Sequence, residues 1–347
     1  MDPSSACRSG SLYQHPSVRQ PFAVIESLFL ACSWRTKREL ASGKMATGRK
    51  VVLVTGSSAG GIGCVCFSSS FVLPHLRFCE ANALCQEFHK RGCIVYASAR
   101  RLESLQTLPE EVHKVALDVT SLESCRSVVD KIVKEQGRID VLVNNAGAGG
   151  TGAVLDADVE SEEGARATFE TNFFAPLRLS KLVAVPMAER RSGLIVNIGS
   201  IVGNIPTPWS GIYSASKAAL HSITETLRME VKGLGIDVML VAPGAITSQF
   251  GKKQLNSFQM PEDSLFKDVA DKIAERAEMS QRADHTMPAA VLASGIVSRA
   301  LRKRPARYYT AGGKSWLFWV FERIPRIVVW TLLGRILGTD KVGRKRR

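Results

Sequence analysis

Residues 50–63 read KVVLVTGSSAGGIG, an apolar run that ends in a glycine-rich turn. A continuous apolar run closed by glycine is typical of a parallel strand that is buried on both faces. Glycines after such a strand let the backbone turn tightly and approach a pyrophosphate, which the amides at the start of a following helix then bind. The stretch therefore predicts the first strand and the nucleotide-binding turn of an α/β fold.

Five further apolar segments have the same form, at residues 93–101, 113–120, 139–147, 193–200 and 235–244. The stretches between them carry apolar residues every three to four positions, the period of a helix. This alternation predicts an α/β fold with a doubly wound parallel sheet, the Rossmann arrangement, whose ligand binds at the carboxyl ends of the strands. We expect a single domain of this kind over residues 49–300, with a C-terminal hydrophobic helical extension.

The glycine turn is interrupted by residues 64–81, which are rich in cysteine, serine and aromatic residues and follow neither a helical nor a strand period. Without this insertion the turn would run directly into a helix with Ala83, Leu84 and Phe88 on one apolar face. A retained intron or a gene-model error is the preferred explanation. A genuine regulatory loop is the alternative.

Basic residues concentrate at the two ends of the chain. Residues 301–347 hold 13 Lys/Arg against Glu322 and Asp340, while 27 basic and 27 acidic residues balance between 45 and 300. A nucleic-acid-binding domain carries its basic stripe on the folded body, so no nucleic-acid partner is expected.

Residues 1–48 are interpreted as a disordered or spurious extension, with a mitochondrial presequence as the alternative. Eight cysteines without paired spacing indicate reduced thiols facing the cytosol and no metal site.

The C-terminal segment 315–337, SWLFWVFERIPRIVVWTLLGRIL, carries three of the five tryptophans. Charged residues and Pro325 divide it into two short apolar pieces, so a transmembrane helix is not expected. Two amphipathic or shallowly inserted helices with a basic end suit an anionic membrane or lipid-droplet surface. The alternative is a helix pair docked on the domain or on the mate in a homodimer.

Two positions bear on the cofactor and the chemistry. The second strand ends in Arg100 and Arg101, and arginine at this point accommodates the 2′-phosphate of NADP(H), whereas the 2′-hydroxyl of NAD(H) is bound by an acidic residue.

The glycine-rich turn also contains GSSAG, residues 56–60, which matches the G-x-S-x-G pattern of a hydrolase nucleophile elbow. A lipid ester hydrolase using Ser58 therefore stays an alternative, although no histidine downstream lies in a telling context.

A serine and a Tyr-x-x-x-Lys pair suggest proton transfer to a carbonyl. Ser200 ends the fifth strand, and Tyr213 and Lys217 follow it in a predicted helix, four residues apart and so on one face. A phenol titrates near pH 10 unless a nearby cation stabilises its anion, which Lys217 is placed to do. We expect Ser200 to hold a carbonyl oxygen while Tyr213 delivers a proton and a nicotinamide delivers hydride.

Taken in order, the glycine turn, NNAG at 144–147, Ser200 and YSASK at 213–217 resemble the short-chain dehydrogenase/reductase family over residues 49–250. The resemblance implies that Asn172 completes a catalytic tetrad and ties a proton-relay water to the lysine. Ala175 departs from the glycine that the family often has. The resemblance and the two arginines together give the residues that we expect to bind the cofactor. They are Gly56, Ser57, Ser58, Gly61, Ile62, Gly63, Arg100, Arg101, Asp118, Val119, Asn144, Ala146, Gly147, Tyr213, Lys217, Pro243, Gly244, Ile246 and Ser248.

The glycine turn is one residue longer than the usual TGxxxGIG of the family. This form, with the ASARRLESL that follows and the apolar, basic tail, is similar to the family's NADPH-dependent reductases of 1-acyldihydroxyacetone phosphate. That similarity implies a lipid ketone substrate, reduced to 1-acylglycerol 3-phosphate in glycerophospholipid and triacylglycerol synthesis at the cytosolic face of the endoplasmic reticulum or lipid droplet. A steroid, retinoid or 3-keto-lipid reductase and an inactive membrane adaptor are the alternatives.

Overall fold

The computed structural model describes residues 48–57, 81–247, 260–279 and 286–343. The chain divides into two units, Met1–Met45 and Ala46–Arg347, and the first lies wholly outside the described residues. The expectations for the N-terminal extension and for the origin of the insertion therefore concern residues almost entirely outside the described part.

Seven parallel strands form one sheet in the order β3-β2-β1-β4-β5-β6-β7. Each of the six predicted strand segments contains one of these strands, which confirms the doubly wound fold. The order reverses between β1 and β4, where folds of this kind bind their ligand. The strands are β1 (Val51–Val54), β2 (Ile94–Ala99), β3 (His113–Ala116), β4 (Val141–Asn144), β5 (Gly193–Ile198), β6 (Ile236–Pro243) and β7 (Tyr308–Ala311).

The edge strand β7 was not predicted. It pairs with β6 from Leu240↔Tyr308 to Pro243↔Ala311, so the sheet extends past the predicted domain boundary at residue 300. Its four residues, YYTA, are only partly buried or exposed and follow the basic stretch RKRPAR. An edge strand of this length carries no apolar run, which is why the sequence pattern did not reveal it.

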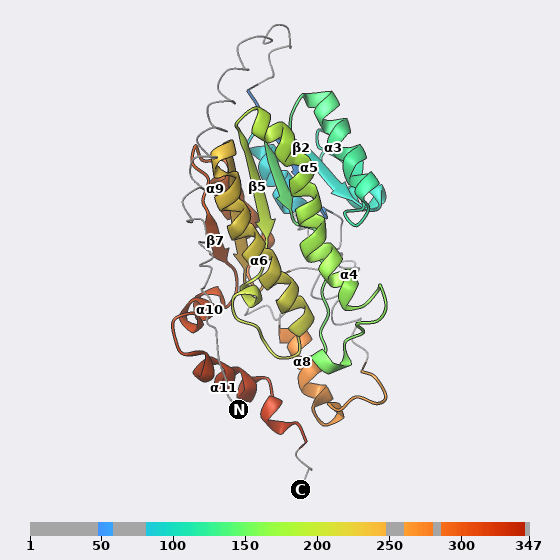
Figure 1. Cartoon of the computed structure of the whole chain (residues 1–347), viewed down its shortest axis with the longest axis vertical. Coiled ribbons are helices and arrows are strands. Elements are labelled where there is room, and N and C mark those ends of the chain that lie inside the picture. The colour runs from blue at the N-terminus through green and yellow to red at the C-terminus, as the bar shows by residue number, and fades with distance from the viewer. Residues whose placement is uncertain (1–47, 58–80, 248–259, 280–285, 344–347) are drawn as a thin grey trace, which may run out of the picture. The chain divides into compact units, whose positions relative to one another are not determined.

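Helices cover both faces of the sheet. One face is covered by α2 (Ala81–Lys90) and α9 (Ala289–Ala300), the other by α3 (Leu122–Gln136), α5 (Ala175–Glu189) and α6 (Gly211–Val231). Alternate residues of β1 separate into the two apolar clusters, Val52 and Val54 in one and Val51 and Leu53 in the other. In Figure 1, α5 and α6 run alongside β5.

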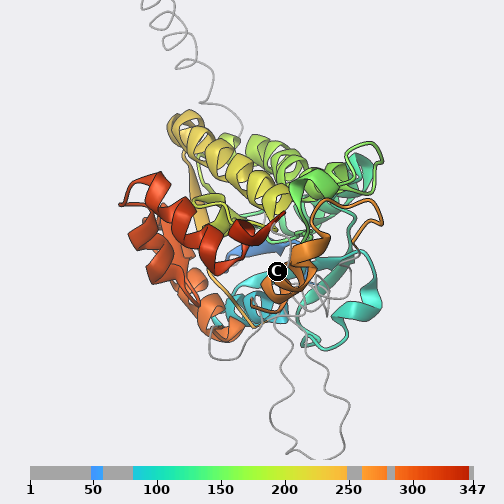
Figure 2. The same ribbon diagram turned by 90° about the horizontal axis from the view of Figure 1, so that it is seen from below.

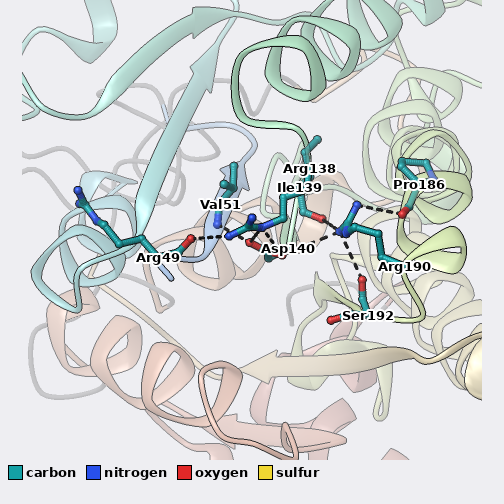
Figure 3. Close-up of polar contacts among 8 residues, drawn as sticks. All are labelled: Arg49, Val51, Arg138, Ile139, Asp140, Pro186, Arg190 and Ser192. Carbon is teal, nitrogen blue, oxygen red and sulfur yellow. Dashed lines mark hydrogen bonds and ion pairs between the residues drawn. The ribbon is translucent and has the colours of Figure 1, made fainter. Parts of the chain in front are cut away.

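A polar network ties the amino edge of the sheet together (Figure 3). Asp140, just before β4, accepts hydrogen bonds from the Val51 backbone N–H at 2.8 Å and from Arg138 Nε at 2.9 Å. Arg138 Nη2 also donates to the Arg49 carbonyl at 3.0 Å, and Arg190 Nη2 lies 3.9 Å from Asp140 Oδ1. These contacts join the starts of β1, β4 and β5. The opposite, carboxyl edge is left for a ligand.

Shorter elements lie at the carboxyl edge. Figure 1 shows α8 (Ala270–Met279), α10 (Ser315–Phe321) and α11 (Arg326–Ile336) beyond the end toward which the β5 arrow points, and Figure 2 views this end from below. The remaining elements are α4 (Ala165–Phe169), the π-helical turn η3 (Glu170–Phe174), and the 3₁₀ turns η1 (Leu102–Leu105), η2 (Val154–Asp156), η4 (Ile201–Gly203), η5 (Lys232–Leu234), η6 (Lys267–Val269) and η8 (Thr339–Lys341).

The C-terminal segment forms the two short helices that the sequence predicts, α10 and α11, separated at Glu322–Pro325. Their inner residues, among them Phe318, Phe321 and Val329, pack against the η4 region in one apolar cluster. Docking on the domain, the alternative left open by the sequence, is therefore observed for this face. Among the helices of the described residues, none combines the length and the apolarity needed to cross a bilayer.

Candidate active site

Ser200 stands two residues beyond β5, at the carboxyl edge of the sheet. Its backbone is extended, and its hydroxyl accepts a hydrogen bond from the Val202 N–H at 3.4 Å, which caps η4. The Ser200 side chain also lies within hydrogen-bonding reach of the Tyr213 hydroxyl and lowers the pKa of that phenol. Two of the predicted catalytic hydroxyls therefore meet at the end of a central strand.

Tyr213 and Lys217 lie one turn apart near the start of α6, on the face that points toward the sheet edge. The Lys217 Nζ lies 5.8 Å from the centroid of the Tyr213 ring and donates to the Ile198 carbonyl at 2.9 Å. Lys217 is only 4% exposed. The hydrogen bond to β5 fixes the beginning of α6 against the strand that carries Ser200, so these three residues form one group.

The structure corrects the expectation that Lys217 makes the phenol acidic. Burial raises the pKa of Tyr213 to about 12, and the hydrogen bond from Ser200 and the charge of Arg276 only partly oppose this rise. Burial lowers the pKa of Lys217 to about 8. The reason is that the site is dry and that the ammonium is directed at the Ile198 carbonyl. At neutral pH both groups keep their protons, which is the state a proton donor requires.

Asn172, the fourth predicted catalytic residue, sits fully buried in the π-helical turn η3. Its Oδ1 accepts from the Ala148 N–H at 2.8 Å, and its Nδ2 donates to the Ala148 carbonyl at 2.7 Å and to Ser216 Oγ at 2.9 Å. A π-turn inside a helix is rare and is found frequently at functional sites. The side chain clamps the loop that follows β4, and its link to a proton-relay water stays a prediction.

Gly147 connects that loop to the catalytic group. A β-carbon at Gly147 would lie 3.4 Å from Asn172 Oδ1 and 3.8 Å from Lys217 Nζ. The NNAG loop therefore passes directly over the asparagine and the lysine. Predicted cofactor residues and predicted catalytic residues adjoin one another here.

His221 is a site residue that the sequence analysis passed over. Its Nε2 accepts from the Ser200 N–H at 3.2 Å, so the ring proton is on Nδ1, which donates to Asn204 Oδ1 at 2.7 Å. Burial and the charge of Lys217 lower the pKa of His221 to about 4, so the ring is neutral. The one available signal was its spacing, four residues after Lys217 on the same helical face.

Asn204 continues this chain of hydrogen bonds into the C-terminal segment. Its Nδ2 donates to the Tyr308 hydroxyl on β7 at 2.8 Å and to the carboxylate of Glu322, the residue directly after α10. The backbone of Ser200 is thus connected to the C-terminal segment through two side chains. Tyr308 and Glu322, which lie in the C-terminal segment 301–347, therefore help to hold the backbone of Ser200 in place.

The glycine turn after β1 fits the pyrophosphate of a dinucleotide as far as it is described. Gly56 has φ +66°, and a β-carbon there would lie 2.5 Å from the Ala146 Cα, so only glycine fits. The Thr55 hydroxyl accepts from the N–H groups of Asn145 and Ala146, both at 3.0 Å. Thr55 and Asn145 were not predicted, yet they hold the turn and the NNAG loop together. Ser58, Gly61, Ile62, Gly63 and Ser248 lie outside the described residues.

The ends of β2 and β3 fit the adenosine half of a cofactor. Arg100 and Arg101 are exposed directly after β2, and neither takes part in an ion pair within the described ranges. Asp118, after β3, accepts from the N–H and the hydroxyl of Thr120 at 3.0 and 2.7 Å, while Val119 is buried behind it. The two guanidinium groups are available to a 2′-phosphate.

Two predicted cofactor residues have side chains committed to the fold. Ser57 Oγ donates to the Val54 carbonyl at 3.1 Å and contacts Cys85 Sγ at 3.3 Å. Asn144 Nδ2 donates to Asn197 Oδ1 at 2.8 Å and thereby joins β4 to β5. A cofactor contact at either position would have to come from the backbone.

The loop after β6 is held at the same sheet edge. The Gly244 N–H donates to the Ala311 carbonyl at 2.8 Å, and a β-carbon on Gly244 would lie 2.2 Å from the Gly313 carbonyl oxygen. Pro243 ends β6, and Ile246 is buried and bridged to Met287. The described residues of the predicted nicotinamide-side loop are therefore fixed in place by β7 and the segment that follows it.

Comparisons with known proteins agree with this arrangement. Residues 81–257 match the family model of the short chain dehydrogenases, a match that begins where α2 begins. Short-chain dehydrogenase PC-15 of Penicillium crustosum is 35% identical over 295 residues, which span 84% of this chain and 99% of that protein. The NADPH-dependent 1-acyldihydroxyacetone phosphate reductase of Schizosaccharomyces pombe is 32% identical over 222 residues, 62% of this chain and 68% of that protein. The crystal structure of a short-chain dehydrogenase from Streptomyces avermitilis superimposes with a TM-score of 0.65 at 27% identity, covering 85% and 100% of the two chains.

The dry environment of Lys217 predicts a measurable pH dependence of stability. The folded chain releases this proton near pH 8, whereas the unfolded chain keeps it up to about pH 10.5. Between these values the unfolded state binds the extra proton, so the free energy of unfolding rises with pH, by up to about 3 kcal/mol. Denaturant titrations at several pH values should show this rise in the native chain relative to Lys217→Met. A difference between the two proteins that does not change with pH would contradict the burial of the charge.

Proposed function

The chain belongs to the short-chain dehydrogenase family and is an oxidoreductase of CH–OH/ketone groups, and we propose that it uses NADPH to reduce a lipid ketone. The leading substrate is 1-acyldihydroxyacetone phosphate. The proposed reductase chemistry rests on one observation: Ser200, Tyr213 and Lys217 lie close together at the carboxyl edge of the sheet. The lipid substrate is supported by the similarity to the S. pombe reductase.

In the proposed reaction, the hydroxyls of Ser200 and Tyr213 both donate to the carbonyl oxygen of the substrate. NADPH, when bound, supplies the hydride to the carbonyl carbon. The C=O bond becomes a C–O single bond, and the oxygen takes the proton of Tyr213, so the product is a neutral alcohol. The high pKa of Tyr213 means that this proton is present throughout the neutral range.

Proton transfer leaves a phenolate that the surrounding cations must stabilise. The Lys217 ammonium lies 5.8 Å from the centroid of the Tyr213 ring, and the charge of Arg276 lowers the pKa of the phenol. Charges act strongly here because the site is shielded from water. Asn172 and His221 position neighbouring groups of the site. Asn172 accepts from the Ala148 N–H and holds that loop, and His221 accepts from the Ser200 N–H. The site is therefore preorganised around the phenolate, which takes a proton from solvent before the next turnover.

NADPH is preferred to NADH in this proposal because of Arg100 and Arg101. Both are exposed at the end of β2, and no acidic residue lies between the end of β2 and Glu103. A free 2′-hydroxyl is normally recognised by an acid at this position, and a 2′-phosphate by arginine. Discrimination between the cofactors follows from these two residues.

The alternatives differ in what they require. A steroid, retinoid or 3-keto-lipid reductase would use the same catalytic group on another ketone. A Ser58 hydrolase has no support from a family of dehydrogenases, and Ser58 lies outside the described residues. An inactive adaptor is opposed by the intact arrangement of Ser200, Tyr213 and Lys217.

Replacing Tyr213 with phenylalanine should abolish NADPH oxidation, because the proton donor is lost while the ring and the packing remain. We expect a loss of at least about 100-fold in kcat across a panel of lipid ketones, the magnitude of general acid catalysis. The assay should use the full chain and a form lacking residues 64–81, with Tyr309→Phe as the matched control. Residual NADPH oxidation close to that of the unmodified chain would contradict the proposed role of Tyr213.

The outward face of the C-terminal helices suits a membrane surface. Trp316, Trp319 and Trp330 are 68%, 52% and 57% exposed, and Ile327 and Ile336 are exposed as well. Tryptophan prefers the boundary between lipid headgroups and acyl chains. Basic residues lie in or next to these helices, namely Lys314, Arg323, Arg326 and Arg335. We propose that this face rests on anionic lipid at the cytosolic side of the endoplasmic reticulum and on lipid droplets.

Membrane binding should depend on the three exposed tryptophans and not on the docked face. The triple substitution of Trp316, Trp319 and Trp330 by serine should lower co-flotation with vesicles that contain phosphatidylserine by about tenfold or more, because apolar area buried in lipid is lost. A matched triple substitution of exposed Val185, Met229 and Leu234 by serine serves as the control. Equal flotation of the two variants would reject the membrane-facing role. Deletion of the whole segment is less informative, because its inner face packs beside the catalytic site.

A further inference from the structure

Arg276 on α8 lies near the catalytic tyrosine, whose pKa its charge lowers. Its Nη2 donates to Thr207 Oγ1 at 3.2 Å, and Thr207 is buried in the segment between η4 and α6. The helix that carries it is fixed by Ile273, which packs with Trp209 in one apolar cluster, and by the buried Ala277. The packing of α8 therefore holds Arg276 beside Thr207.

The guanidinium is close enough to Tyr213 for its charge to lower the pKa of the phenol. Desolvation lowers the pKa of Arg276 itself, and the nearby Tyr213 opposes this shift. In the part of the chain that the structure describes, no carboxylate forms an ion pair with Arg276. The neighbouring acid on α8, Glu275, forms an ion pair with Lys272 at 2.6 Å.

The Arg276 guanidinium has more hydrogen-bond donors than the Thr207 hydroxyl can satisfy. A guanidinium offers five N–H donors, and Thr207 Oγ1 accepts from Nη2 alone. Arg276 is half-buried, and a charge that is partly removed from water is unfavourable unless it is paired with an opposite charge. Since no described residue supplies that charge, an anion brought in with the substrate would complete the site.

We propose that Arg276 and Thr207 form the receptor for an anionic group, phosphate or carboxylate, that the ketone substrate carries close to its carbonyl. The planar fork of a guanidinium matches two oxygens of such a group. The receptor lies beside the hydroxyl that protonates the carbonyl, so the anion must be only a few bonds from the ketone. This inference rests on the proposed function and narrows it to anionic ketones, since a neutral steroid or retinoid ketone would leave Arg276 unpaired.

Kinetics on a set of ketones with the same acyl chain test the proposal. The set contains 1-acyldihydroxyacetone phosphate, the same compound without its phosphate, and a keto acid with a carboxylate in place of the phosphate. Arg276→Gln should reduce kcat/KM about 10- to 100-fold more on whichever charged ketone the unmodified chain prefers than on the neutral ketone, and this extra loss should arise mainly through KM. Arg276→Lys should recover part of the loss. The two charged compounds distinguish phosphate from carboxylate.

The outcomes separate the receptor from the proposed function. An equal loss on charged and neutral ketones would show that Arg276 acts through Tyr213 and would overturn the receptor, as would a preference of the unmodified chain for the neutral ketone. Absence of NADPH oxidation with every ketone would contradict the proposed function, and direct binding then decides the receptor. In that measurement, sn-glycerol 3-phosphate should bind the unmodified chain and the control Arg302→Gln equally and bind Arg276→Gln about tenfold more weakly. Equal binding to all three proteins would overturn the receptor.

Discussion

The hydrogen bond from the buried Lys217 ammonium to the Ile198 carbonyl is the interaction on which the rest of the site depends. It places the start of α6 against the end of β5, and that contact sets three further positions. Tyr213 meets Ser200, His221 receives the Ser200 N–H, and the lysine itself lies beneath Gly147. A buried charge is normally unfavourable, so a lysine at this place costs stability that the fold must supply elsewhere. The apolar clusters on both faces of the sheet and the polar network around Asp140 provide it.

Parallel strands bring their carboxyl ends to one edge, and this explains how distant segments form one site. The turn after β1, the loop after β4, the serine after β5 and the loop after β6 all converge there, while α8 and the C-terminal helices cover the edge from outside. The C-terminal segment has two faces with different partners. Phe318 and Val329 dock on the domain, and the hydrogen bonds of Asn204 to Tyr308 and Glu322 connect this docking to Ser200 through His221. The exposed tryptophans are left for an external surface.

Much of this arrangement could be predicted from the sequence, because its signals are local. The six strand segments are continuous apolar runs, and Tyr213 and Lys217 are recognisable by their spacing after Ser200. What could not be predicted depends on tertiary contacts. β7 is a short edge strand without an apolar pattern, and the side chains of Ser57 and Asn144 turn into the fold because of neighbours far along the chain. The pKa of Tyr213 follows from burial, which spacing does not reveal, and Arg276 comes from a helix with no motif.

The central claim is that the hydroxyls of Ser200 and Tyr213 together hold the oxygen that is reduced. A crystal structure of the full chain with NADP⁺ and the alcohol product tests it most directly. The account predicts that the product oxygen lies within about 3 Å of both hydroxyls, with Lys217 still bonded to β5. A product oxygen bound elsewhere, or Tyr213 and Lys217 turned away from the carboxyl edge of the sheet, would contradict it.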